Sequence, residues 1–418
     1  MTSRHDADGY QPSDTLHLWW LGKPDQPLLI GTLSMVRALK GVSLRYSPAW
    51  LRAGFALSED LPLVEGERLP IEKETAAGAV DDARPDRWGE RVIRHLDRPA
   101  RLSLMEFLYF AGDDRFGALG VSTSAERYLP RRLGPLPVLA DVAQMADLVR
   151  QVLAGEAVAP AQRRLIAPGV SMGGARPKAL LAMDGQPWVL KFTEPGLAVD
   201  MPLVEHAAMT LAAMAGIRVA ATRPIRLAAG HAVAVQRFDR AGGQRLHALS
   251  AKVALQAAGE AMGYPELAQV LRRRGVADAG RGRAQMQELF RRMVFNILID
   301  NTDDHEKNHV LLMTDRGDYE LSPAFDVLPA GQALGYQQMR VGRDMADAML
   351  ANALSEHPQF GLDRREAEAQ LGRVAQVVEH WKQHFTAIGV RDADVQWLAQ
   401  QIDRPFLADQ RRAWCVTR

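Results

Sequence analysis

A run of nine polar residues, N-T-D-D-H-E-K-N-H from Asn301 to His309, separates two apolar segments of the sequence. From His305 the run contains H-E-x-x-H, a zinc-binding spacing that one helix must carry. From Asp303 it contains D-x-x-x-x-N, the spacing of a kinase catalytic loop. The two interpretations require different local structures and different chemistry, so choosing between them determines what fold and function to expect.

The zinc interpretation needs a helix that continues through both histidines, and the flanking residues argue against one. Residues 290–300 (FRRMVFNILID) have a helical apolar pattern, but residues 301–304 are four poor helix formers in succession. After His309, the segment VLLMTDRGDYELS predicts two short strands around a turn at 315–318. Because Cys415 is the only cysteine, an intrachain disulfide and a thiolate zinc site are also excluded.

The kinase interpretation agrees with the same context. Phosphoryl transfer needs one carboxylate to hold the attacking hydroxyl, and a carboxylate with an amide oxygen to hold Mg²⁺. The segment LSPAFDVLP (321–329) places Asp326 after the predicted strand pair. Asp303 stands five residues before Asn308, whereas Asp304 stands only four before it. The spacing therefore predicts Asp303 as the base, and Asn308 with Asp326 as the metal ligands.

Three upstream features are ambiguous singly but occur in the order that a kinase requires. The glycine-rich segment GVSMGGARPK (169–178) could cover phosphates or could be a plain hairpin turn. Lys191, at the end of the strand pattern WVLKF, could reach phosphates or lie solvated at a strand edge. Glu205, early in the next helix pattern, could orient that lysine or cap the helix.

The rest of the chain predicts a β-rich middle part and a helical C-terminal part. We expect helices, hairpin turns and one flexible basic loop in the following places: helices over 83–96, 102–112, 135–155 and, amphipathic, 201–216; turns at Asp184-Gly185 and Gly230; a loop over 272–283. We expect four divisions of the chain: a mobile tail (1–14), an N-terminal subdomain (15–155), a kinase N-lobe (160–240) and a helical C-lobe (241–418).

Composition limits the function classes further. The chain has 418 residues and a formal net charge of +1, so it can bury a large core and carries no strong nucleic-acid footprint. No apolar run reaches membrane-spanning length, and Met1 is followed by polar residues. We therefore expect a cytoplasmic protein.

Taken together, the sequence resembles the HipA family of bacterial serine/threonine kinases, which are toxins of toxin–antitoxin pairs. The C-terminal part carries the resemblance in SMGGARPKAL, VLKF, VEHAAMTLAAMAGI, AVQRFDR, NTDDHEKNHVLL and LSPAFDVLP. The N-terminal part is similar to that family's amino-terminal subdomain in LRYSPAWLRAG, ARPDRWGERVI and DRFGALGVS. The resemblance implies an α+β, two-lobed, protein-kinase-like fold with β-rich N-terminal subdomains and a mostly helical C-terminal lobe.

The resemblance also implies a role for individual residues. It makes Asp303 the catalytic aspartate and Asn308 and Asp326 the Mg²⁺ ligands. It places the ATP-binding residues in four segments: Ser171, Met172, Gly173, Gly174, Ala175 and Lys178 in the phosphate loop; Lys191 and Glu205; Gln236 and Phe238 at the adenine-side hinge; His305 and Lys307 in the catalytic loop. Ser171 matches a serine that family members autophosphorylate.

The function implied is ATP- and Mg²⁺-dependent phosphorylation of a translation component, such as an aminoacyl-tRNA synthetase, causing growth arrest. The implied partner is a small helix-turn-helix antitoxin resembling HipB, through which DNA would be contacted indirectly. The alternative is a kinase-fold corepressor of weak catalytic power that acts with such a partner. The retained acids argue against it, because buried like charges are costly to keep in a scaffold.

Overall fold

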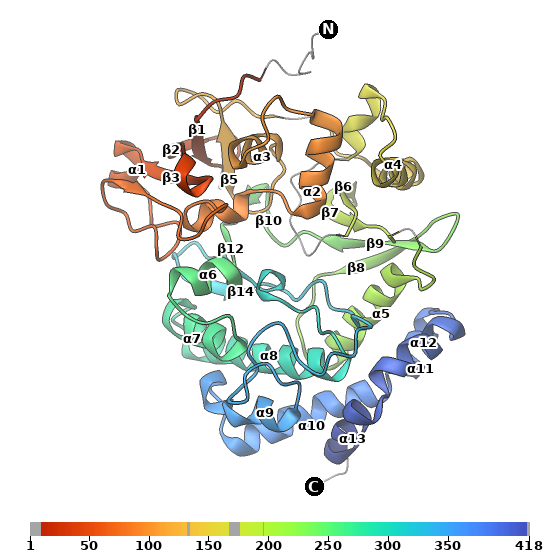
Figure 1. Ribbon diagram of the computed structural model, residues 1–418. Helices are drawn as coiled ribbons and strands as arrows, with labels where there is room; N and C mark the ends of the chain where they lie inside the picture. Colours follow the sequence, from red (N-terminus) through yellow and green to blue (C-terminus); the bar gives the residue numbers. More distant parts are fainter. Residues whose placement is uncertain (1–9, 132–133, 167–175, 195, 416–418) are drawn as a thin grey trace. The chain divides into compact units, whose positions relative to one another are not determined.

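A computed structural model of the chain describes residues 10–131, 134–166, 176–194 and 196–415 (Figure 1). The chain divides into two compact units. The first contains the described residues before position 195 together with Gln236–Leu249, and the second contains Gly196–Val235 and the described residues from Ser250 onward. In these described ranges, no helix is both long enough and apolar enough to cross a membrane.

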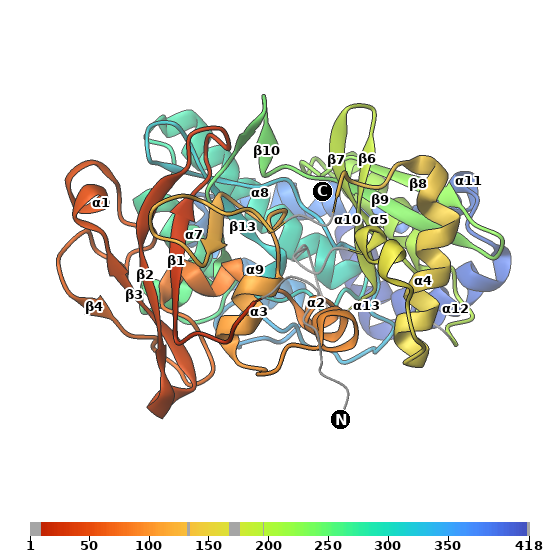
Figure 2. The same cartoon turned by 90° about the horizontal axis from the view of Figure 1, so that it is seen from above.

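The first unit begins with an antiparallel sheet of five strands in the order β4-β3-β2-β1-β5 (Figure 2). Its strands are β1 (Thr15–Trp20), β2 (Leu28–Val36), β3 (Gly41–Tyr46), β4 (Glu67–Arg68) and β5 (Leu119–Ser122). Leu16, Leu18, Leu33 and Leu44 of this sheet are completely buried. Their burial on one side of the sheet follows from the two-residue alternation of strand side chains. The β-rich character that the resemblance implies for the N-terminal part is thus confirmed.

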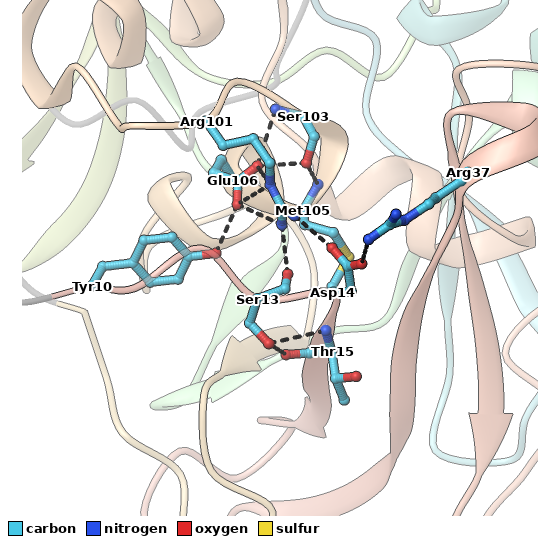
Figure 3. Close-up of polar contacts among 9 residues, drawn as sticks. All are labelled: Tyr10, Ser13, Asp14, Thr15, Arg37, Arg101, Ser103, Met105 and Glu106. Atoms are coloured by element: carbon cyan, nitrogen blue, oxygen red, sulfur yellow. Dashed lines mark hydrogen bonds and ion pairs between the residues drawn. The ribbon is translucent and has the colours of Figure 1, made fainter.

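A network of charged side chains holds the chain just before β1 (Figure 3). Tyr10 is only 3% exposed, and its hydroxyl donates to Glu106 Oε1 at 3.0 Å. Arg101 joins this buried Glu106, through its Nε, to Asp14, whose Oδ1 lies 2.5 Å from Arg101 Nη1. These contacts of Tyr10 and Asp14 argue against mobility in residues 10–14, and residues 1–9 of the predicted tail lie outside the described residues.

Helices and a hairpin complete the first unit. Their bounds are α1 (Pro48–Ala53), α2 (Arg87–Val92), α3 (Leu104–Phe110), α4 (Val142–Ala154), β6 (Lys178–Met183), β7 (Gln186–Lys191), β10 (Arg240–Ala241) and β11 (Gln244–Arg245), with β12 (Ala248–Ser250) after them. The helices predicted over 83–96, 102–112 and 135–155 correspond to α2, α3 and α4. Asp184 and Gly185 join β6 to β7 with φ angles of 53° and 70°. This is the conformation that an Asp-Gly hairpin turn requires, so the predicted hairpin is confirmed.

Asp239 forms the centre of a second buried network in the first unit. Its carboxylate accepts hydrogen bonds from Arg237 Nη2 at 2.7 Å, Arg240 Nη1 at 2.6 Å and the Gly117 backbone N–H at 2.8 Å. Both arginines also donate to the backbone carbonyl of Arg115. Burial alone would raise the pKa of Asp239, but the two guanidinium groups hold it well below the usual value. The network ties residues 115–117 to the start of β10.

Replacing Asp239 by asparagine should lower the free energy of unfolding by about 3–5 kcal/mol, because two buried guanidinium groups would lose their counter-charge. Urea unfolding of the full chain measures the effect. Asp25 is exposed and provides the control, since Asp25→Asn should change the unfolding free energy by less than about 0.5 kcal/mol. Equal, small effects of both substitutions would show that the network does not stabilise the fold.

The second unit is mainly helical and has two hairpins. Its elements are α5 (Met201–Met214), β8 (Thr222–Arg226), β9 (His231–Gln236), α6 (Ala251–Ala257), α7 (Tyr264–Arg274), α8 (Ala279–Leu298), β13 (Val310–Met313), β14 (Tyr319–Leu321), α9 (Leu350–Ser355), α10 (Arg364–Glu379), α11 (Trp381–Ile388), α12 (Asp392–Ile402) and α13 (Pro405–Cys415). The helix α10 packs against α8 and α13 (Figure 1). Phe290, Phe295 and Leu298 of α8 are completely buried, so this helix forms the core of the unit.

Two sequence predictions for this unit need correction. The segment 272–283 is not a loop: α7 continues to Arg274, and α8 begins at Ala279 with Asp278 accepting from the Gly280 backbone N–H at 3.1 Å. Capping by Asp278 allows a helix to start among glycines and arginines. The predicted amphipathic helix exists as α5, but most of its residues are buried, so it is a core helix. The strand pairs β8–β9 and β13–β14 are as predicted.

Candidate active site

The predicted catalytic loop follows the buried helix α8 directly. Asp300, with a φ of 58°, ends the helical region, and the loop then forms a single short helical turn over Glu306–Asn308 before β13. His305 and His309 therefore do not share a face of one α-helix. The H-E-x-x-H interpretation fails on this backbone geometry, because a zincin site needs both imidazoles on one helix face.

The two neighbouring aspartates of the loop have opposite environments. Asp303 is exposed, whereas Asp304 is only 2% exposed. Asp304 Oδ2 accepts a hydrogen bond from the hydroxyl of Tyr264 and lies 2.8 Å from His309 Nε2. Burial would raise the pKa of Asp304, but His309 and these hydrogen bonds outweigh burial and lower it. Asp304 is thus held in place inside the unit, whereas the side chain of Asp303 is exposed to solvent.

Tyr264 and His309 position Asp304, a role that the sequence did not reveal for either residue. Tyr264 is completely buried at the start of α7, and its ring contacts the His309 ring edge-to-face at 5.5 Å. Burial and the adjacent Asp304 carboxylate raise the pKa of Tyr264 well above its usual value. Nothing in the local sequence marks Tyr264, because it lies 40 residues from Asp304.

Asn308 has an unusual hydrogen-bonding state. Its side chain is 4% exposed, and its Nδ2 donates to the backbone carbonyl of Asp303 at 3.5 Å. Its Oδ1 is buried and has no hydrogen-bond partner among the described residues. An unpaired buried acceptor costs about 1–3 kcal/mol, and a ligand bound to it would offset that cost. Amide and carboxylate oxygens are ligands that Mg²⁺ accepts.

Asp326 is the second predicted metal ligand, and its backbone is strained. It has a φ of 57° and is 8% exposed. Its neighbours Phe325 and Val327 line the same small cavity as Asn308, so the fold brings the two predicted ligands into one region. A strained non-glycine conformation at this place is typical of a functional site.

The segment before Asp326 is held by backbone and side-chain contacts. The hairpin β13–β14 pairs Leu311 with Leu321, and the Ser322 backbone N–H donates to Val310 O at 2.8 Å. From α8, Arg292 Nη2 donates to the carbonyl of Ser322 at 2.6 Å. Arg292 is 2% exposed, so its charge lies inside the unit, where its Nε also donates to Glu288 Oε1. These contacts determine where Asp326 lies.

Both predicted lysines of the β6–β7 hairpin are buried. Lys178 and Lys191 face each other in the register of the hairpin and are 0% and 2% exposed. Lys178 forms an ion pair with Asp86, which also caps α2 by accepting from the Gly89 N–H. The alternative in which Lys191 is a solvated strand-edge residue is therefore wrong. Burying an ammonium group costs free energy unless the group is paired. Both positions therefore require compensation for the charge of the lysine.

The other predicted nucleotide-binding residues lie in several elements. In the second unit, Glu205 is the fifth residue of α5 and 1% exposed, so the helix-capping alternative is also wrong. In the first unit, Gln236 and Phe238 are half-buried, and the Phe238 ring contacts Phe116 edge-to-face at 5.8 Å. The remaining positions are these: His305 is partly exposed, Lys307 is exposed, and Ser171, Met172, Gly173, Gly174 and Ala175 lie outside the described residues.

Comparison with solved structures identifies the fold. The chain superposes on HipA from the complex of Shewanella oneidensis MR-1 HipA, HipB and operator DNA with a TM-score of 0.65. The match has 20% sequence identity and covers 95% of this chain and 97% of that one. The fold is accordingly the α+β, protein-kinase-like fold predicted from the sequence, with β-rich N-terminal sheets and a helical C-terminal part.

Sequence comparison then identifies the family. Residues 170–381 match the HipA-like C-terminal domain, and residues 26–122 match the HipA N-terminal domain. The chain belongs to the HipA family. It is also 31% identical over 160 residues to a putative kinase, Y4dM, of Sinorhizobium fredii. This alignment spans only 37% of that relative's length.

Proposed function

We propose that this chain is an ATP- and Mg²⁺-dependent serine/threonine protein kinase that serves as the toxin of a toxin–antitoxin pair. The observation that carries the proposal is the buried Oδ1 of Asn308, which has no partner among the residues that the structure describes and lies in the same region as the strained Asp326. An acceptor of this kind suits a metal ion that arrives with the nucleotide phosphates. The exposed Asp303 nearby in the same loop suits a base that must meet a substrate hydroxyl.

Each predicted residue receives a role in this proposal. Asn308 and Asp326 hold Mg²⁺, which neutralises charge on the phosphates when bound. Asp303 accepts the proton of the attacking hydroxyl. Lys191 pairs with the phosphates, and Glu205 is assigned to the nucleotide site by family resemblance. We assign the remaining contacts by family resemblance: Lys178 and residues 171–175 at the phosphates, Gln236 and Phe238 at the adenine, and His305 and Lys307 beside the transferred group.

A labelled-phosphate assay tests the proposal. Purified full-length protein with γ-labelled ATP, Mg²⁺ and casein as acceptor should transfer label, and chelation by EDTA should stop transfer. Asn308→Ala should raise the Mg²⁺ concentration needed for half-maximal transfer, because one metal ligand is lost. Absence of transfer by the folded wild-type protein would favour the corepressor alternative, in which the kinase fold serves only as a scaffold.

The partner and the substrate are proposed from relatives. The solved HipA is in a complex with HipB and operator DNA. We infer a small helix-turn-helix antitoxin as the partner of this chain, with DNA contacted through that partner. As the substrate we propose a translation component such as an aminoacyl-tRNA synthetase. Co-expression with the neighbouring gene product should relieve growth arrest caused by this chain.

Replacing Lys191 by methionine should weaken ATP binding by about tenfold, because one charge-assisted bond to phosphate is lost. Methionine keeps the apolar stem, which suits the buried position. Calorimetric titration with Mg²⁺ and a non-hydrolysable ATP analogue measures the affinity. Lys252 on α6 is half-buried and is not proposed to contact nucleotide, so Lys252→Met serves as the control for loss of one charge. Unchanged affinity of the Lys191 variant would remove the lysine from the proposed site.

Ser171 should become phosphorylated after incubation with ATP, and this modification should reduce ATP affinity. A phosphate adds about −1.5 to −2 charges beside the position proposed for the nucleotide phosphates. At about 4 Å and an effective dielectric near 20, each like-charge pair costs roughly 4 kcal/mol. Phosphopeptide mapping and the ATP affinities of Ser171→Asp and Ser171→Ala test this. An unmodified Ser171 with normal ATP binding by the Asp variant would contradict the prediction.

A further inference from the structure

The second unit contains a cavity that the proposed kinase chemistry does not use. It has a volume of about 540 Å³ and lies where the end of α5 meets α8 and α10. Eight residues line it: Met214, Ala215, Gly216, Arg291, Arg373, Gln376, Val377 and His380. None of the predicted nucleotide-binding or metal-binding residues is among them. The volume is within the range of about 300–1,000 Å³ that is typical of ligand sites.

The lining of this cavity is cationic. It includes the guanidinium groups of Arg291 and Arg373 and the imidazole of His380, and no acidic residue. Burial lowers the pKa of Arg291, and the smaller repulsion from Arg373 acts in the same direction. Glu288 opposes the lowering more strongly than Arg373 adds to it, but its carboxylate accepts from the buried Arg292 and does not line the cavity. Two arginines that repel each other favour an anionic ligand between them.

Arg291 is held in a fixed orientation. Its Nε donates to Gly216 O at 3.0 Å and its Nη1 donates to Gln370 Oε1 at 2.9 Å. The bond to Gly216 is also a structural one, because it satisfies a carbonyl just beyond the end of α5. Neither the Nη2 of Arg291 nor the guanidinium of Arg373 donates a hydrogen bond to any described residue. Arg291 is therefore preorganised, and Arg373 supplies a second cation with its donors available.

Apolar side chains accompany these charges at an open rim. Met214 is 62% exposed, and Val377 is half-buried. Arg373, Gln376 and His380 are exposed on α10, so the cavity is open to solvent. A small metabolite is usually enclosed over most of its surface, which this rim does not provide. An extended segment of another chain can place carboxylates on the arginines and an apolar side chain on Met214 without being enclosed.

We propose that this cavity is a docking site for a segment of a protein partner that combines carboxylate and apolar side chains. Charge complementarity with Arg291 and Arg373 would select the carboxylates, and Met214 with Val377 would receive the apolar group. The proposal does not depend on the proposed kinase activity, because docking requires neither ATP nor Mg²⁺. Its failure would leave the phosphotransfer assay unaffected.

Fluorescence anisotropy with the full chain and a labelled peptide, Asp-Leu-Glu-Phe-Asp, tests the site. Arg373→Gln should weaken binding by about fivefold, the upper range for an exposed ion pair. Arg365→Gln is the matched control, because Arg365 is exposed on the same helix and does not line the cavity. Met214→Ser should weaken binding of the same peptide. It should not affect binding of a peptide in which serine replaces both leucine and phenylalanine.

Several results would overturn the proposal. These are equal binding of the amide version, Asn-Leu-Gln-Phe-Asn; equal losses from Arg373→Gln and Arg365→Gln; or no binding of the acidic peptide. Competition by inorganic phosphate at the same concentration as the peptide would point to a simple anion site and would likewise overturn it. Retained binding in EDTA without nucleotide is the result expected from a docking site separate from catalysis.

Discussion

Asp303→Asn is expected to reduce phosphotransfer by about 10²- to 10⁴-fold, the contribution typical of a positioned general base. Asparagine has nearly the same size but cannot accept the hydroxyl proton. Asp303 is exposed, so the variant should unfold at the same urea concentration as the wild type. Initial rates with γ-labelled ATP and casein measure phosphotransfer, and urea unfolding of the same preparation measures stability.

Two other acids provide the comparison for Asp303. Asp315 is exposed in the turn between β13 and β14, so Asp315→Asn should retain full activity and stability. Asp304→Asn should act mainly through stability, since Asp304 is buried and bonded to Tyr264 and His309. If the Asp303 variant were fully active, or if a folded Asp304 variant were equally inactive, Asp303 would not be the base.

Asp304→Ala is expected to lower the free energy of unfolding by about 3–5 kcal/mol, because the buried Tyr264 hydroxyl and His309 ring would lose their acceptor. Tyr264→Phe removes only one hydroxyl and should cost about 1–2 kcal/mol. Asp303→Ala, at an exposed position of the same loop, should change stability by less than about 0.5 kcal/mol. Urea unfolding measures all three variants.

The pH dependence of stability gives a second measure of this network. The pKa of Asp304 is lowered in the folded chain. Its contribution is therefore present above the pKa of the unfolded chain, and it is lost as the pH falls through the lower folded value. The Asp304→Ala variant should lose less stability than the wild type in that acidic range. Parallel acid unfolding of the two proteins would contradict the role given to the Asp304 carboxylate.

Local sequence patterns predicted much of the secondary structure. The Asp184-Gly185 turn is confirmed because its two positive φ angles are a local requirement that these residues meet. The prediction of a flexible loop over 272–283 is wrong. The arginines and glycines of this segment are typical of a loop, but the Asp278 cap allows a helix to start there. The prediction that α5 is amphipathic is wrong, because most of its residues are buried. Other elements of the unit cover them, which the sequence of α5 alone does not reveal.

The candidate site was predicted in part. The spacing of Asp303, Asn308 and Asp326 supports the chemistry that we propose, since the required carboxylate and amide groups recur at set distances along a kinase chain. The spacing did not show that Asn308 Oδ1 is buried without a partner or that Lys191 is buried. Burial depends on neighbouring elements, so a single strand pattern allowed a solvated lysine as readily as a buried one.

By itself, the sequence determined most of the order of helices and strands and the family resemblance, and it predicted the loop chemistry, because these depend on residues close together in the chain. Only the tertiary structure decided which aspartate of the loop is buried and which is exposed. Tyr264 reaches Asp304 from 40 residues away. In the same way, Arg291 and Arg373 line one cavity although they belong to different helices. Contacts between distant residues form only when helices pack, and no local pattern encodes them.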